Sequence, residues 1–179
     1  MRVRTIILLA SLAAAAAAPA RAAGMHAPPP ADESSITPDM VKQAFHGVSR
    51  AAVTFPGGRV IAVEIADTPA RVTYGYMYRT EVRDDEGMIF VFPDADVHAF
   101  WMKNTLVPLD IIWLDDRFDV VYVQNATPPC KSDPCPSYGS LRKASYVLEL
   151  KSGVARREGL KAGSRLGVTF PDGVGGGAR

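Results

Sequence analysis

The stretch HAFWMKNTLVPLDIIWLDDRFDVVYVQ, residues 98–124, decides the fold class of this 179-residue chain. It contains three short runs that are rich in β-branched and aromatic side chains. Runs of this length and composition are typical of β-strands and too short for independent helices. The polar triplet Asp115–Arg117 favours a turn between the second run and the third. The stretch therefore predicts strands at residues 98–104, 110–114 and 119–124.

The same pattern continues on both sides of this stretch. A hairpin is predicted before it, because two alternating runs flank the turn sequence Pro56-Gly57-Gly58. In the second arm of that hairpin, alternation puts Glu64 on the face opposite to the apolar side chains. The further strands are predicted at 51–55, 59–66, 88–92, 145–150 and 165–170. About eight short strands and few helices indicate a mainly β fold, either an antiparallel β-sandwich or a small barrel.

Two or three short helices complete the prediction. Thr37-Pro38 and Thr68-Pro69 each place a capping residue before proline, which is favoured at the first helical position. From the second of these signals we expect a helix over residues 70–78, with Ala70, Tyr74, Met77 and Tyr78 on one face and Arg79 at its end. A third helix is expected within residues 154–160.

The first residues are not expected to belong to the fold. Residues 1–22 have the layout of a secretory signal peptide: two arginines, an apolar run from Ile6 to Ala18 and then small residues. The run is shorter than the roughly 20 apolar residues that a membrane span needs. We expect cleavage after Ala20 or Ala22, export to the periplasm or the outside, and no stable membrane span afterwards.

The remaining chain is predicted to form a single β-rich domain over residues 36–171. Residues 23–35 are rich in proline and polar side chains, which predicts a flexible linker. Residues 172–179 form a Gly-rich tail with no side chains to bury. We find no internal repeat.

Composition excludes several classes of function. Lys and Arg number 20 and Asp and Glu number 19, so no strong field would recruit nucleic acid. Without residues 1–22 the chain would carry 17 basic and 19 acidic residues, which weakens a nucleic-acid partner further. The Gly-x-Ser-x-Gly and His-Glu-x-x-His signatures of hydrolases are absent. We expect no cofactor.

Cys130 and Cys135 lie in a proline-punctuated loop and are predicted to form a disulfide, the default in an oxidising compartment. The bridge would stiffen a loop that makes a contact of some kind, within the protein or with a ligand or partner. The alternative is a redox pair, but four residues separate the cysteines where the usual redox motif has two. No histidine lies nearby, so we predict no metal there.

Trp101, Lys103 and Asn104 are the first candidates for ligand binding. An aromatic ring beside a cation and an amide suits a polar ligand such as a sugar, by ring stacking and hydrogen bonding. The structural alternative makes Trp101 a core residue, Lys103 a solvated stem and Asn104 a turn former.

Arg79 and Asp110 extend this candidate site. Asp110 opens an otherwise apolar strand, so its carboxylate needs a charged partner or backbone N–H groups. Lys103 or Arg79 could supply the charge, and such a pair is either structural or part of a site. Arg79 is also the kind of cation that a helix C-terminus favours without any function.

A copper site is a further alternative for an exported protein. Imidazole and thioether ligands suit Cu(I), and His98 and Met102 share a face of one predicted strand. Met88 and Met77 would complete the set, although both lie in runs that resemble core.

Four motifs resemble those of domain-of-unknown-function family 192, which is bacterial and archaeal and often exported. The resemblance covers roughly residues 50–170. It implies a β-sandwich with short helices, in agreement with the predicted strands, and no established activity. The motifs are GYMYR (75–79), EGMIFVFP (86–93), FWMKNTLVPLDIIWLD (100–115) and YVLELKSG (146–153).

Three functions follow as hypotheses. The first is non-catalytic binding of a small polar, saccharide-like ligand or of an envelope component at Arg79, Trp101, Lys103, Asn104 and Asp110. The second is an envelope hydrolase or transferase that uses Asp110 as a base beside Lys103. The third is a structural or interaction module without a small-molecule site. The sequence leaves the oligomeric state open.

Overall fold

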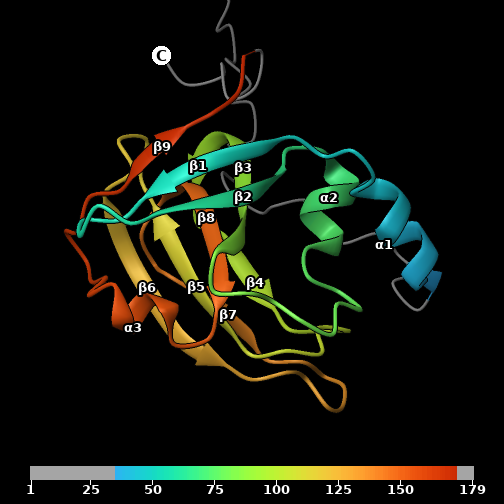
Figure 1. Cartoon of the computed structure of the whole chain (residues 1–179). Coiled ribbons are helices and arrows are strands. Elements are labelled where there is room, and N and C mark those ends of the chain that lie inside the picture. Colours follow the sequence, from blue (N-terminus) through green and yellow to red (C-terminus); the bar gives the residue numbers. More distant parts are fainter. Residues whose placement is uncertain (1–34, 173–179) are drawn as a thin grey trace, which may run out of the picture.

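A computed structural model describes residues 35–172, in which nine strands and three helices form one curved β structure (Figure 1). The predicted signal peptide, all but the last residue of the predicted linker, and residues 173–179 of the predicted tail lie outside the described residues. Within residues 35–172, none of the helices is long and apolar enough to cross a membrane.

Seven strands form the large sheet, and two form a small one. All neighbours in the large sheet are antiparallel except β2 (Val60–Ala66) and β3 (Glu86–Asp96). These two strands are parallel because the chain crosses over between them through the helix α2 (Pro69–Tyr74). In spatial order the large sheet contains β6 (Val120–Thr127), β5 (Leu109–Leu114), β8 (Ala144–Lys151), β3 (Glu86–Asp96), β2 (Val60–Ala66), β1 (Arg50–Thr54) and β9 (Gly167–Thr169), and the small sheet pairs β4 (Ala99–Trp101) with β7 (Ser137–Gly139).

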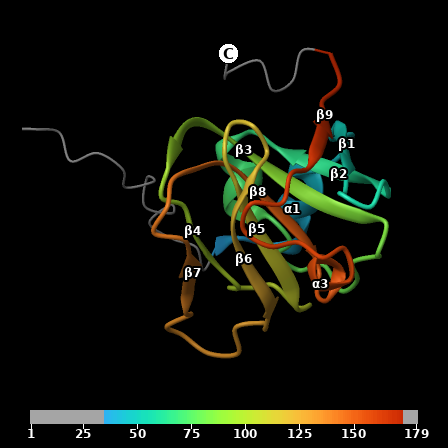
Figure 2. The same cartoon turned by 90° about the vertical axis from the view of Figure 1, so that its left-hand side faces the viewer.

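The prediction of a mainly β fold with about eight strands and two or three helices is confirmed. The sheet is mixed rather than purely antiparallel, and it is not closed into a barrel, since β6 and β9 remain its two ends. Strands β1, β2 and β9 cross the top of the molecule, while β5, β6 and β8 run below them at a steep angle (Figures 1 and 2).

The helices are α1 (Pro38–Ala44), α2 (Pro69–Tyr74) and α3 (Val154–Arg157). Both predicted caps are confirmed: the hydroxyl groups of Thr37 and Thr68 each accept a backbone N–H from the first turn, at 3.3 Å. The prediction that α2 extends to residue 78 is wrong. The helix ends at Gly75, whose φ of 46° lies outside the helical region.

Residues 75–78 therefore form turns and one β-bridge rather than a continuation of the helix. Met77 forms a β-bridge with Thr105, and the backbone N–H of Tyr78 donates to the carbonyl of Asn104 at 2.8 Å. Asn104 itself has a φ of 55°, which ends the predicted strand 98–104 early and leaves only the three residues of β4. These contacts bring the segment that carries Arg79 against the FWMKN motif.

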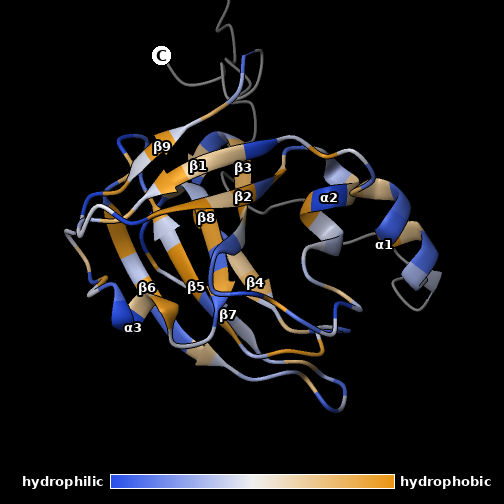
Figure 3. Ribbon diagram, viewed as in Figure 1, coloured by the Kyte–Doolittle hydropathy of each residue, from blue (hydrophilic) through white to orange (hydrophobic). Residues whose placement is uncertain are grey.

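The large sheet has an apolar cluster on each face. Ile111 and Trp113 point to the face that α1 and the Met77 segment cover, whereas Ile112 and Leu114 point to the face that carries α3. The strands of the sheet hold most of the hydrophobic residues, and the connecting loops most of the hydrophilic ones (Figure 3). Burial of both faces explains why β5 and β8 read as nearly continuous apolar runs.

Candidate functional site

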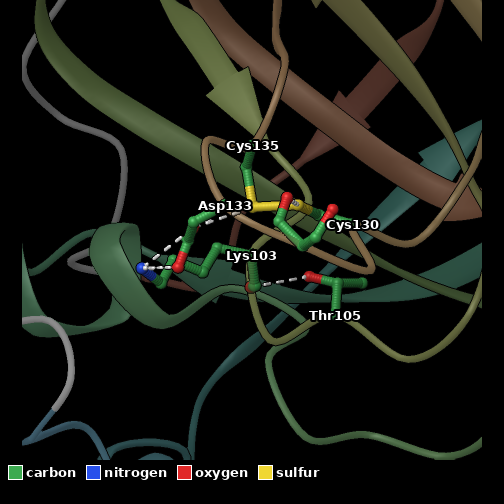
Figure 4. The surroundings of a disulfide bond; sticks show 6 residues. Lys103, Thr105, Cys130, Asp133 and Cys135 are labelled. Atoms are coloured by element: carbon green, nitrogen blue, oxygen red, sulfur yellow. Dashed lines mark hydrogen bonds and ion pairs between the residues drawn. A yellow bond between two sulfur atoms is a disulfide. The ribbon is translucent and has the colours of Figure 1, made fainter.

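The disulfide loop contacts the FWMKN motif. Cys130 and Cys135 form the predicted bridge, and Asp133 lies between them in sequence. Both carboxylate oxygens of Asp133 are 3.2 Å from the Lys103 ammonium (Figure 4). That ammonium also lies 5.7 Å from the centre of the Trp101 ring, a cation–π distance. Trp101 and Lys103 therefore form one patch with the loop.

Replacing both Cys130 and Cys135 with serine is expected to lower the free energy of unfolding by about 2 kcal/mol. The bridge stabilises the protein by restricting the unfolded chain, and the effect is modest because the closed loop is short. Urea denaturation measures this effect. Asp133→Asn is the matched control, since it weakens the contact with Lys103 but keeps the bridge. Equal stability of the double variant and the wild type would mean that the bridge has no stabilising role.

Asp110 lies apart from this patch. Its side chain is fully buried and accepts two backbone N–H groups, from Ala126 at 2.8 Å and from Ala155 at 2.9 Å. Of the two kinds of partner that the sequence left open, a charge or backbone N–H groups, the structure shows the second, and neither Lys103 nor Arg79 pairs with this carboxylate. Asp110 shares the face of Ile112, on the side of the sheet where α3 lies. The carboxylate therefore ties α3 and β6 to β5, and no acid–base pair with Lys103 is formed.

Arg79 is held on the opposite face by three groups. Its guanidinium donates to Glu64 at 2.5 Å and lies over the rings of Phe45 and Tyr76, at 4.8 and 5.1 Å from their centres. Two rings and a carboxylate fix the plane of the guanidinium, so the group is oriented before any ligand arrives. About a quarter of the side chain, 27%, stays exposed.

Two hollows meet at Arg79. The smaller one lies over β2 and the start of β3, and the larger one is a groove between α1 and the Met77–Arg79 segment. Arg79 is the residue common to both. The smaller hollow is lined by Arg50, Ala62, Glu64, Tyr76, Arg79, Glu86 and Gly87, and the groove by Pro38, Asp39, Val41, Lys42, Phe45, His46, Met77, Tyr78 and Arg79.

Glu149 lies beside Arg79 in the interior of the protein. In register, Glu64, Met88 and Glu149 are direct neighbours across β2, β3 and β8, so their side chains share one face. Only 4% of Glu149 is exposed, and its Oε2 has no hydrogen-bond partner within residues 35–172. Burial raises its pKa to about 8, against a smaller lowering by the charge of Arg79.

Gly75 and Tyr76, in the turn after α2, lie close to Glu149. A Cβ at Gly75 would lie 3.7 Å from Oε2 of Glu149 and 3.3 Å from the Phe90 ring, so the turn packs closely over the acid. Burial also raises the pKa of the Tyr76 hydroxyl, which stays protonated and neutral. The candidate site is thus Arg79, with Glu64 on one side and a buried acid behind it.

The sequence model of the DUF192 family, described as "Uncharacterized ACR", matches residues 52–168. The chain belongs to the DUF192 family. The resemblance stated from the sequence motifs is therefore confirmed. Among curated proteins, none matches the chain.

Solved structures support the fold of this DUF192 domain. A protein of unknown function from Novosphingobium aromaticivorans is 34% identical, with a TM-score of 0.60, and the match covers 67% of this chain and 84% of that one. A Sinorhizobium meliloti protein, provisionally named a transcription regulator, is 31% identical with a TM-score of 0.60, over 67% of this chain and 92% of that one.

The DUF192 domain brings some predicted site residues together and separates others. Trp101 and Lys103 share a patch, and Asn104 is joined to the Arg79 segment through the backbone of Tyr78. Sequence reasoning missed Glu64, Tyr76 and Glu149 as neighbours of Arg79. An acid in the middle of the buried run SYVLEL was the available signal for Glu149.

The described residues do not favour a metal site. Within residues 35–172, no three His, Cys, Asp or Glu side chains gather as metal ligands would. The methionines of the copper hypothesis, Met77, Met88 and Met102, are all buried in one apolar cluster. His98 is also buried and stacks on the Phe92 ring, with 3.5 Å between the ring centres.

Proposed function

We propose that this DUF192 domain is an exported, non-catalytic binding domain for a small polar ligand of saccharide type. The ligand would lie in the groove between α1 and the Met77–Arg79 segment. The observation that carries the proposal is the state of Arg79, which is fixed between the Phe45 and Tyr76 rings, partly exposed and common to both hollows.

The groove has the chemistry that a saccharide requires. Aromatic rings such as those of Phe45 and Tyr78 offer faces for the apolar side of a sugar ring. Three polar side chains along the same groove add hydrogen-bonding groups: the carboxylate of Asp39, the ammonium of Lys42 and the imidazole of His46. A wall of rings with a few polar groups is the usual composition of a small-molecule site.

Trp101, Lys103 and Asn104 belong to the proposal as flanking residues. Asn104 supports the segment that presents Arg79, since its carbonyl accepts the N–H of Tyr78. Trp101 and Lys103, with the disulfide loop, form a second polar and aromatic surface that a larger envelope saccharide would reach from the same side of the sheet.

Export is supported by the disulfide, because such bonds persist in oxidising compartments such as the periplasm. The sequence of residues 1–22 also supports export, because it has the layout of a signal peptide. We therefore propose the periplasm or the cell exterior as the location of the domain.

Replacing Arg79 with glutamine is expected to weaken saccharide binding at least about tenfold. In the wild type, a ligand at 100 times its Kd stabilises by about 2.7 kcal/mol, which raises Tm by roughly 5–10 °C in a protein of this size. Losing a charged hydrogen bond to the ligand weakens binding at least about tenfold, which removes about half of that shift or more. Thermal unfolding with D-glucose, N-acetyl-D-glucosamine and D-glucuronate measures it.

Arg165→Gln is the matched control for Arg79→Gln. Arg165 also pairs with a carboxylate, that of Asp119 at 2.5 Å, but it is 62% exposed and lies outside both hollows. We expect this control to keep the full shift. An undiminished shift in Arg79→Gln would place the ligand elsewhere, and no shift with any saccharide would contradict the proposed function.

An interaction module is the second candidate. It is favoured by Leu141, which is 98% exposed in the connection between β7 and β8, next to Arg142 and Lys143. An exposed leucine beside two cations suits contact with an envelope component rather than a small molecule. Retention of the purified domain on isolated envelope fractions, lost in Leu141→Ser, would support this candidate.

A further inference from the structure

We infer that the ligand at Arg79 carries a carboxylate, so that an acidic saccharide binds in preference to a neutral one, and that Glu149 is a positioning residue that leaves the Arg79 charge available to it. The inference rests on the proposed function and names the ligand class of the same site. It follows from the charges around Arg79, from its unused donors and from the buried acid behind it.

The groove in which the ligand would lie holds more cations than anions. Its charged side chains are Lys42 and Arg79 against the single carboxylate of Asp39. Glu64 is shared between two cations, since its carboxylate lies 2.5 Å from Arg79 and 3.7 Å from Arg50. A ligand with a negative group would balance the positive charge of the groove.

Arg79 also has donors to spare. A guanidinium carries five N–H donors in a planar fork that matches a carboxylate with two parallel hydrogen bonds. Within residues 35–172, Glu64 is the one hydrogen-bond acceptor that Arg79 uses, through Nη2. Because the Phe45 and Tyr76 rings already fix the plane of the group, a planar carboxylate would find the fork oriented.

The protonation state of Glu149 determines whether the positive charge of Arg79 is available to a ligand. Its nearest neighbours in the sheet, Met88 on β3 and Ile111 on β5, carry no charge. The titratable groups that act on it are Arg79 and Tyr76, from the segment that packs over the sheet, and Glu64 lies one strand further away on β2. A buried carboxyl group without a hydrogen bond is neutral near pH 7 and leaves Arg79 unpaired on that side.

Ionised Glu149 would change the balance. With a pKa of about 8, the group is protonated at pH 7 and loses its proton at higher pH. The Glu149 carboxylate would then compete with the ligand for Arg79 and cancel the excess positive charge around Arg79. A neutral saccharide has no group that senses this change, so only the acidic ligand should respond to it.

The test is calorimetric titration of the purified protein with D-glucuronate and D-glucose between pH 6.5 and 9.5. At pH 7 we expect glucuronate to bind at least about tenfold more tightly than glucose, the loss that one charged hydrogen bond accounts for. The affinity for glucuronate should fall about tenfold as the pH rises through 8, and the affinity for glucose should stay constant. In Glu149→Gln, glucuronate should bind with its pH 7 affinity over the whole range.

Glu86→Gln is the matched control, because it also changes an acid near Arg79 to an amide but should keep the fall above pH 8. Equal affinity for the two sugars, or a parallel fall in wild type and Glu149→Gln, would overturn the inference. If Glu149→Gln does not fold, the comparison of the two sugars in the wild type decides. Failure of the proposed function differs from these results, since then neither sugar would bind the wild type, or Arg79→Gln would bind both sugars as tightly as the wild type does.

Discussion

Asp110→Ala is expected to lower the free energy of unfolding by about 3 kcal/mol or more, one of the largest effects of a single substitution in this protein. The carboxylate accepts two backbone N–H groups at 2.8 and 2.9 Å in a place where water does not reach it. Hydrogen bonds to a charged group contribute roughly 1.5–3 kcal/mol each, and their loss leaves buried donors without a partner. Urea denaturation followed by tryptophan fluorescence measures the change.

The backbone N–H groups of Ala155 and Ala126 depend on the Asp110 carboxylate as their acceptor. Ala155 lies in the first turn of α3, where the cap residue Gly153 offers no side chain to the free N–H groups. Asp110 supplies the missing acceptor from β5, and its other oxygen holds Ala126 on β6. The same carboxylate therefore fixes one helix and one edge strand to the centre of the sheet.

Two further variants distinguish this role from ligand binding. Asp110→Asn keeps the shape but can accept only through one atom, so an intermediate loss is expected. Asp116→Ala, an exposed acid in the turn after β5, should change stability by less than about 0.5 kcal/mol. If Asp110→Ala were as stable as Asp116→Ala and yet failed to bind glucuronate, Asp110 would return to the ligand site.

The fold could be predicted from the sequence where local signals decide it. The strands follow from β-branched and aromatic runs, and the starts of α1 and α2 from Thr-Pro pairs that cap and initiate a helix within three residues. The end of α2 was missed because Gly75 is compatible with a helix by pattern and leaves it only through a positive φ. The parallel pairing of β2 with β3 could not be predicted either, because it depends on how the chain crosses over the sheet and not on a local pattern.

The candidate site was predicted only in part, because its contacts join distant residues. Arg79 was identified, but its partner Glu64 lies on the far side of α2 in the sequence, and Glu149 reaches the same face only through the register of β3 with β8. Asp110 was recognised as an acid that needs a partner. Its backbone donors come from two other elements, so no spacing in the sequence reveals them.

Glu149→Gln is expected to make the protein more stable than the wild type at pH 8 and above. In the unfolded chain the carboxyl group ionises near its ordinary pKa of 4.5, whereas burial raises the pKa in the folded protein to about 8. The folded state therefore holds the proton more tightly, and the stability of the wild type falls as the pH rises from about 4.5 to about 8. The difference amounts to on the order of 5 kcal/mol, at about 1.36 kcal/mol for each pKa unit.

The measurement is the free energy of unfolding of both proteins from pH 4.5 to 9.5. The difference between Glu149→Gln and the wild type should grow in favour of the variant through this window and become constant above pH 8, where the acid is ionised in both states. The free energy of unfolding of Glu86→Gln, which changes a less buried acid at the start of β3, should run parallel to that of the wild type. A constant difference across the whole window would contradict the prediction. It would mean that the folded protein stabilises the ionised acid, through Arg79 or through water, as well as solvent does.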